Sequence, residues 1–152
     1  MKNIIFVFTL SILIFSCNDT KKETAYVSMK ALETESTHPG KKLMETNCYA
    51  CHNPTASHDD RLGPPMIAIK KHYINEGVTK EEFISAIQNW IKNPTEDSAK
   101  MNGAVRRFGI MPKQVFPEET IEQISNYIYD NEIEQPEWFE EHFKSRKGKN
   151  RG

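Results

Sequence analysis

The chain carries the run Cys48-Tyr49-Ala50-Cys51-His52, and most expectations about its fold start from these five residues. A Cys-x-x-Cys-His run is the attachment signature of c-type haem. Two thiols one helical turn apart can each add to a vinyl group of the porphyrin, and the adjacent imidazole can take the iron as an axial ligand. The run therefore predicts one covalently held haem c, attached through Cys48 and Cys51 and ligated by His52.

Three other interpretations compete with haem attachment. A thioredoxin-like redox pair needs a preceding strand and a βαβ context, which this sequence does not suggest. A structural zinc site needs a second pair of ligands at the usual spacing, and the only other cysteine, Cys17, lies far from the run. The third interpretation is a chance match in a small exported protein.

The segments on both sides of the run favour haem. Residues 61–66 read Arg-Leu-Gly-Pro-Pro-Met, a rigid turn in which the carbonyl of Pro64 can hold the second ring nitrogen of His52. Residues 108–112 read Phe-Gly-Ile-Met-Pro and place the thioether of Met111 between a flexible and a stiff residue. Such a loop can present sulfur to the sixth position of the iron. Met101 lacks a following proline and is interpreted as a loop or packing residue.

Together these markers resemble a class I (monohaem) cytochrome c over about residues 38–130. The resemblance also rests on Gly40, eight residues before the first cysteine of the attachment run, and on Met44 at a position where the family usually has an aromatic residue. It implies an electron-transfer protein whose Pro64 carbonyl accepts the N–H of the axial His52. It further implies a set of haem-contacting side chains that includes Met66 (usually Leu in the family), Trp90 and the sixth ligand Met111.

Nothing in the chain alternates like a strand, so an all-α fold is expected. Helices are predicted over residues 40–48 and 65–73, from a capping box at Thr79 to Pro94, and from about Pro117 onward. The intervening residues 95–107 are expected to form a loop. A domain of this size has little apolar core, so the haem-free chain is expected to be largely unfolded. Two groups of side chains are expected to fill the interior: Trp90, Phe108, Met66 and Tyr127 around the porphyrin, and Phe83 and Ile87 as ordinary core.

The N-terminal residues are interpreted as targeting signals. Residues 4–15 form an apolar run that is shorter than the roughly 20 residues a membrane-spanning helix needs, so residues 1–16 are predicted to be a signal peptide. Ser16-Cys17 resembles the lipobox of bacterial lipoproteins, in which Cys17 would be acylated. A plain signal peptide or an uncleaved anchor remains the alternative. The polar residues 17–37 are expected to be a flexible tether.

The C-terminal residues 131–152 lie outside the resemblance. Trp138 with His142, and Phe139 with Phe143, are spaced as neighbours on a helix. A helix docked on the domain and followed by a solvated basic end is favoured over a partner-binding or membrane-surface element. Of the remaining histidines, His58 is expected to lie in a loop, because it follows His52 by only six residues. His38, His72 and His142 are expected to be solvated, which disfavours a bis-histidine haem.

The charge of the whole chain is −1, from 20 basic and 21 acidic residues, so no global basic field would attract nucleic acid. The predicted function is a one-electron carrier, not an enzyme, exported to the periplasmic side and anchored to a bacterial membrane. Its expected partners are an unidentified redox donor and acceptor. The alternatives are a haem enzyme or gas sensor with a labile sixth ligand, and a fixed electron-relay subunit of a larger oxidase or reductase.

Overall fold

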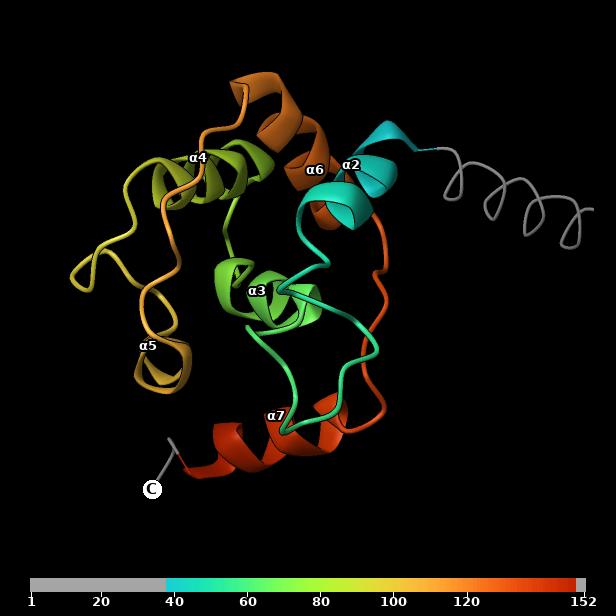
Figure 1. Cartoon of the computed structure of the whole chain (residues 1–152), viewed down its shortest axis with the longest axis vertical. Helices are drawn as coiled ribbons and strands as arrows, with labels where there is room; N and C mark the ends of the chain where they lie inside the picture. The colour runs from blue at the N-terminus through green and yellow to red at the C-terminus, as the bar shows by residue number, and fades with distance from the viewer. Residues whose placement is uncertain (1–37, 150–152) are drawn as a thin grey trace, which may run out of the picture.

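The computed structural model describes residues 38–149, with side chains as far as residue 146. This part of the chain contains helices and no strand (Figure 1), which confirms the all-α prediction. The predicted signal peptide (1–16), the tether (17–37) with Cys17, and the last three residues lie outside the described residues. In chain order, the helices are α2 (Pro39–Asn47), α3 (Met66–Tyr73), α4 (Lys80–Lys92), α5 (Asn102–Phe108), α6 (Glu118–Asp130) and α7 (Phe139–Lys149).

Local hydrogen bonds begin two of the helices. At the start of α4, the hydroxyl of Thr79 accepts the N–H of Glu82 at 3.2 Å. The Glu82 carboxylate in turn accepts the N–H of Thr79 at 2.9 Å, which completes the predicted capping box. At the start of α2, the ring nitrogen Nδ1 of His38 accepts the N–H of Gly40 at 3.0 Å. Both caps satisfy backbone donors that a helix leaves unpaired at its first turn.

Helices α2 and α6 cross in close contact at the upper end of the molecule, and α4 packs against α6 (Figure 1). The side chains of Met44, Phe83, Tyr127 and Ile128 are almost fully buried there. These three helices form the main apolar core. The inner faces of α4 and α6 also provide one wall of the cavity described below.

The loop expected over residues 95–107 is wrong in its second half, because Asn102–Phe108 forms the short helix α5. Met101 is the residue that precedes this helix. The sequence carried a signal for it, since Met101, Ala104, Val105 and Phe108 have the i, i+3, i+4, i+7 spacing of an apolar helix face. The helix has only seven residues, so the pattern spans a single repeat.

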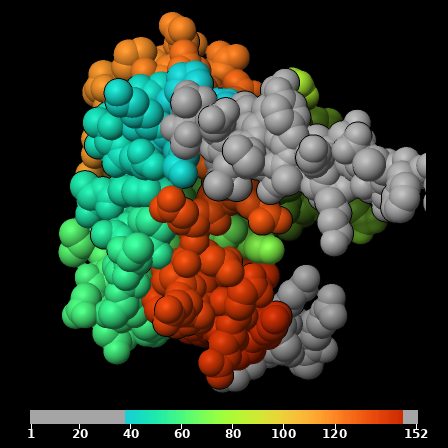
Figure 2. Space-filling view, turned by 90° about the vertical axis from the view of Figure 1, so that its right-hand side faces the viewer, coloured from blue at the N-terminus to red at the C-terminus, as the bar shows by residue number. Residues whose placement is uncertain are grey.

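The predicted aromatic helix near the C-terminus is present as α7 and packs on the domain (Figure 2). The ring N–H of Trp138 donates to the carbonyl oxygen of Ala56 at 3.0 Å. Phe139 is buried, and its ring stacks on Phe143 with 5.6 Å between centroids. The C-terminal segment thereby covers the loop that follows the Cys-x-x-Cys-His run. Among the described helices, none has the length and apolar character needed to cross a bilayer.

Candidate functional site

A cavity of about 410 Å³ lies among α3, α4, α5, α6 and the loops that connect them. Its size falls in the range of roughly 300–1,000 Å³ found for small-molecule and cofactor sites. Most of the residues that line this cavity are apolar. Its walls include all seven residues predicted to bind the cofactor, namely Cys48, Cys51, His52, Pro64, Met66, Trp90 and Met111.

The Cys-x-x-Cys-His run forms a tight turn directly after α2. The N–H of Cys48 donates to Met44 at the helix end, and the N–H groups of Cys51 and His52 both donate to the carbonyl of Cys48, at 3.2 and 2.9 Å. These bonds place both thiols and the imidazole on one turn at the edge of the cavity. Burial raises the pKa of the Cys48 thiol to about 11, so this thiol is protonated at neutral pH, whereas Cys51 is exposed.

His52 is oriented by the loop that contains Pro64. Its Nδ1 lies 2.6 Å from the carbonyl oxygen of Pro64. Because a carbonyl can only accept, Nδ1 must carry the proton, which leaves Nε2 unprotonated in the neutral ring. Burial lowers the pKa of His52, and the hydrogen bond to Pro64 only partly opposes this shift. The neutral imidazole with a free Nε2 is the form that binds metals.

Gly63 allows this loop to approach His52. A β-carbon at position 63 would lie 3.2 Å from the carbonyl oxygen of Cys51 and 3.4 Å from ring atoms of His52. Those distances are shorter than ordinary van der Waals contact, and the Cys51 oxygen belongs to the backbone. A side chain at position 63 would therefore push the loop away from the imidazole.

Met111 lies in a stretch without regular structure between α5 and α6, and its side chain is half-exposed. The stretch begins at Gly109, whose φ of 78° is in the region that favours glycine. The turn at Gly109 lets the chain leave α5 and return along the cavity. Met101, interpreted from the sequence as a loop or packing residue, lies just before α5 and lines the same cavity.

Two further expectations about the interior need correction. Tyr127 does not line the cavity; its ring packs against His38, with 5.2 Å between centroids, and it is buried between α2 and α6. Ile87 is buried as expected, but it also forms part of the cavity wall. Helical spacing identifies the inner face of a helix, but it does not separate the side chains that meet a neighbouring helix from those that face a cavity.

His58 lies in the loop between α2 and α3, as expected, whereas the expectation that His38, His72 and His142 are solvated holds only for His72. The structure leaves His38, His58 and His142 half-buried. His38 caps α2, and the ring of His58 lies 5.1 Å from each of the rings of Trp138 and His142. Among the described histidines, His52 alone lines the cavity.

The edge of the cavity is apolar and open to solvent. Leu62 is 71% exposed and Ile110 is 44% exposed, and both line the cavity. Large aliphatic side chains at these positions surround the opening without closing it.

Within the described part of the chain, no three or more His, Cys, Asp or Glu side chains cluster to hold a metal ion by themselves. Comparisons of the chain with protein-family models, with curated proteins and with solved structures found no match.

Proposed function

We propose that this protein is a one-electron carrier that uses a single covalently attached haem c, with a helical domain similar to class I cytochromes c wrapped around it. The observation that carries the proposal is the convergence on one cavity of two cysteines, a histidine and a methionine from separate segments of the chain. Cys48, Cys51 and His52 come from the turn after α2, whereas Met111 comes from a stretch about 60 residues later.

The residues around the cavity fit such a group. Two thiols at its edge can form the thioether links, and the oriented, neutral His52 offers Nε2 as an axial ligand. The walls are mainly aliphatic and aromatic side chains, which suit the flat apolar surface of a porphyrin. Trp90 from α4 and Met66 from α3 are among these wall residues. When bound, the haem iron would supply a couple between its ferric and ferrous states.

The protein would orient the cofactor and control its surroundings. The carbonyl of Pro64 fixes the ring of His52 in position, and Gly63 permits this close approach. Met111 would supply a thioether ligand, which would raise the reduction potential relative to a bis-histidine site. If His52 and Met111 both bind the iron, the protein would leave no ligand position for a substrate. The absence of other described histidines from the cavity wall favours His52 with Met111 over a second histidine.

The cellular setting belongs to the same proposal. A signal peptide over residues 1–16 would export the chain, and acylation of Cys17 would anchor it to the membrane on the periplasmic side. Residues 17–37 would tether the domain close to membrane redox complexes, raising its effective concentration there. Electrons would pass between protein partners through the apolar opening that Leu62 and Ile110 surround.

The test is the visible spectrum of the exported, haem-matured protein in both oxidation states, with a carbon monoxide challenge. We expect haem that stays with the denatured polypeptide, a low-spin reduced spectrum, a weak thioether–iron(III) band at the red edge and no response to carbon monoxide. Replacing either cysteine of the run by alanine should reduce the covalently retained haem. A matured protein without covalent haem would overturn the proposal.

Two methionine variants identify the sixth ligand. Met111→Ala should lose the red band, whereas Met101→Ala, its control from the same cavity, should keep it. Loss of the band in Met101→Ala alone would identify Met101, instead of Met111, as the sixth ligand. A high-spin spectrum or a prompt shift with carbon monoxide would favour a haem enzyme or gas sensor. Stable co-purification with an oxidase or reductase would favour a fixed relay subunit.

A further inference from the structure

A second cavity, of about 680 Å³, lies between α3, α5 and α7. Its wall includes aromatic and small apolar residues such as Phe139, Phe143 and Ala68. No Asp or Glu of the described residues lines it. Its lining is instead rich in basic residues, with two histidines, His72 and His142, and six cations, Arg61, Lys71, Lys100, Arg106, Arg107 and Arg146.

Most of these cations have no acidic partner among the described residues. Arg107 lies 3.6 Å from the carboxylate of Asp59. Lys100 lies over the ring of Tyr73, a contact that leaves its charge uncompensated. Within the described residues, no carboxylate lies within ion-pair distance of five of them, Arg61, Lys71, Lys100, Arg106 and Arg146. Like charges gathered in a concave wall raise the local concentration of anions.

Arg61 is built into the wall of this cavity. Its guanidinium lies 4.5 Å from the ring centre of Trp138 and 5.4 Å from that of Phe108, and it donates to the carbonyl of His58. Its Nε is buried and has no hydrogen-bond partner in the described structure. A buried donor left unpaired costs free energy. A negative charge in the cavity would attract the positive guanidinium of Arg61 and offset part of that cost.

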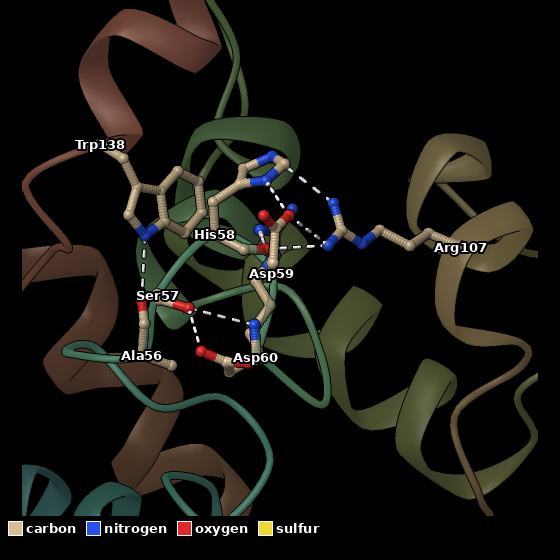
Figure 3. A network of polar contacts seen from close by, with 8 residues as sticks. Ala56, Ser57, His58, Asp59, Asp60, Arg107 and Trp138 are labelled. Carbon is tan, nitrogen blue, oxygen red and sulfur yellow. Dashed lines mark hydrogen bonds and ion pairs between the residues drawn. The ribbon is translucent and has the colours of Figure 1, made fainter.

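Contacts between distant segments hold this wall in place (Figure 3). Arg107 reaches from α5 to the loop after the Cys-x-x-Cys-His run and donates to the carbonyl of His58 at 2.8 Å. Trp138, just before α7, donates to Ala56 in the same loop. The cavity is therefore an assembled feature of three segments and not a chance run of basic residues in the sequence. The pKa of His142 is lowered first by burial and then by the positive charges of neighbours that include Arg61, Arg107 and Arg146.

We propose that this cavity binds a small soluble polyanion that carries clustered phosphate or carboxylate groups. The cations of α3, α5 and α7 would pair with its charged groups, and the aromatic rings of α7 would contact its carbon framework. The concave wall between three helices, with cations on several of its sides, suits a small molecule better than the flat surface of a membrane. This cavity adjoins the one described above, since Pro64, Lys100, Met101, Ala104 and Phe108 line both.

The experiment is calorimetric titration of the full chain with inorganic pyrophosphate and, separately, with citrate, at low salt. We expect one saturable site for at least one probe, with an affinity that falls as salt is added. The double variant Lys71→Gln/Arg106→Gln should bind that probe about tenfold more weakly, a change of about 1.4 kcal/mol. The matched control, Lys42→Gln/Lys113→Gln, removes the same charge from exposed positions outside the cavity and should bind within about twofold of the parent protein.

Three outcomes would overturn the proposal. The first is no saturable binding of either probe, and the second is equal weakening of binding in both double variants. The third is that phosphatidylglycerol vesicles bind the protein more strongly than phosphatidylcholine vesicles do, and that this preference is lost in Lys71→Gln/Arg106→Gln. The last result would assign these residues to a membrane surface. Because Lys71 and Arg106 are exposed, their replacement should leave the fold intact. If that variant does not fold, Lys100→Gln/Arg146→Gln tests the same expectation. The haem spectrum is measured separately, so failure here leaves the proposed function standing.

Discussion

Gly40 in α2 lies directly against Gln123 in α6. A β-carbon at position 40 would overlap the carbonyl oxygen of Gln123 and would stand 2.8 Å from both the carbonyl carbon of Gln123 and the Cβ of Tyr127. Two of these atoms belong to the backbone of a helix, so they cannot move aside as the end of a flexible side chain can. The crossing of the first and last helices of the 38–130 segment therefore requires glycine at this point.

Gly40→Ala should lower the free energy of unfolding by about 3 kcal/mol, because the two helices must separate to admit the methyl group. Urea unfolding of the purified full chain measures this loss. The matched control is Gly103→Ala in α5, where the nearest atom to the new β-carbon is the end of the Arg106 side chain at 3.9 Å. That control should be neutral or gain up to about 1 kcal/mol. Equal effects in the two variants would contradict the close crossing.

Gly63→Ala should disturb the site more than the fold. The added methyl group would press on the Cys51 carbonyl and the His52 ring, and the Pro64 loop would shift away from the imidazole. We expect a loss of about 1–3 kcal/mol of stability together with a change in the visible spectrum of the matured protein. Gly103→Ala again serves as control and should leave the spectrum as it is. An unchanged spectrum in Gly63→Ala would mean that the loop does not position His52.

Trp138→Phe should lower the free energy of unfolding by about 1 kcal/mol, since it removes the donor to the Ala56 carbonyl but keeps an aromatic ring beside Arg61. Chemical denaturation measures the difference. Proteolysis of the native protein should show faster cleavage within α7 than in the parent, because that bond ties the segment before α7 to the domain. Identical stability and cleavage would show that the bond contributes nothing in solution.

Acid should weaken the docking of α7 through His142. Burial and nearby positive charge lower the pKa of His142 below its ordinary value of 6.5, so the docked state favours the neutral ring. The undocked chain then binds more protons as the pH falls, and the stability contributed by this contact is complete above pH 6.5 and is lost below it. We expect the parent protein to lose more stability between pH 7.5 and 5 than His142→Gln does.

Urea unfolding of both proteins at the two pH values gives the comparison. Titrating groups away from His142 act in both proteins and cancel in the difference, whereas His58, whose ring lies 5.1 Å from that of His142, is coupled to it, so the comparison measures the response of this pair. Equal losses in parent and variant would remove His142 from the pH response.

Much of the site could be predicted from the sequence because its parts are local. The turn from Cys48 to His52 follows from five consecutive residues, and the capping box at Thr79 follows from four. The spacing of Pro64 and Met111 relative to that turn was sufficient to include both among the candidate residues. The turn and the capping box rest on residues close in the chain, whereas Met111, about 60 residues after the turn, was included because of its own loop sequence and the resemblance.

Which side chains line the cavity could not be predicted from local sequence alone. Met101 and Met111 are both plausible from the sequence as cavity residues, and the packing of α5 places both in the wall. Tyr127 lies on the same helical face as Ile124 and Ile128, yet only the crossing with α2 turns it toward His38 and away from the cavity.

By itself the sequence determined the helices other than α5, the Cys-x-x-Cys-His turn and the chemical groups available for a cofactor, because short-range spacing sets which backbone and side-chain groups can meet within a few residues. Only the tertiary structure decided that α7 covers the loop after that turn. It also decided that cations from positions 61, 71, 106 and 146 face one cavity. The physical reason is that these contacts join segments separated by tens of residues, and their geometry depends on how helices pack rather than on the order of neighbouring residues.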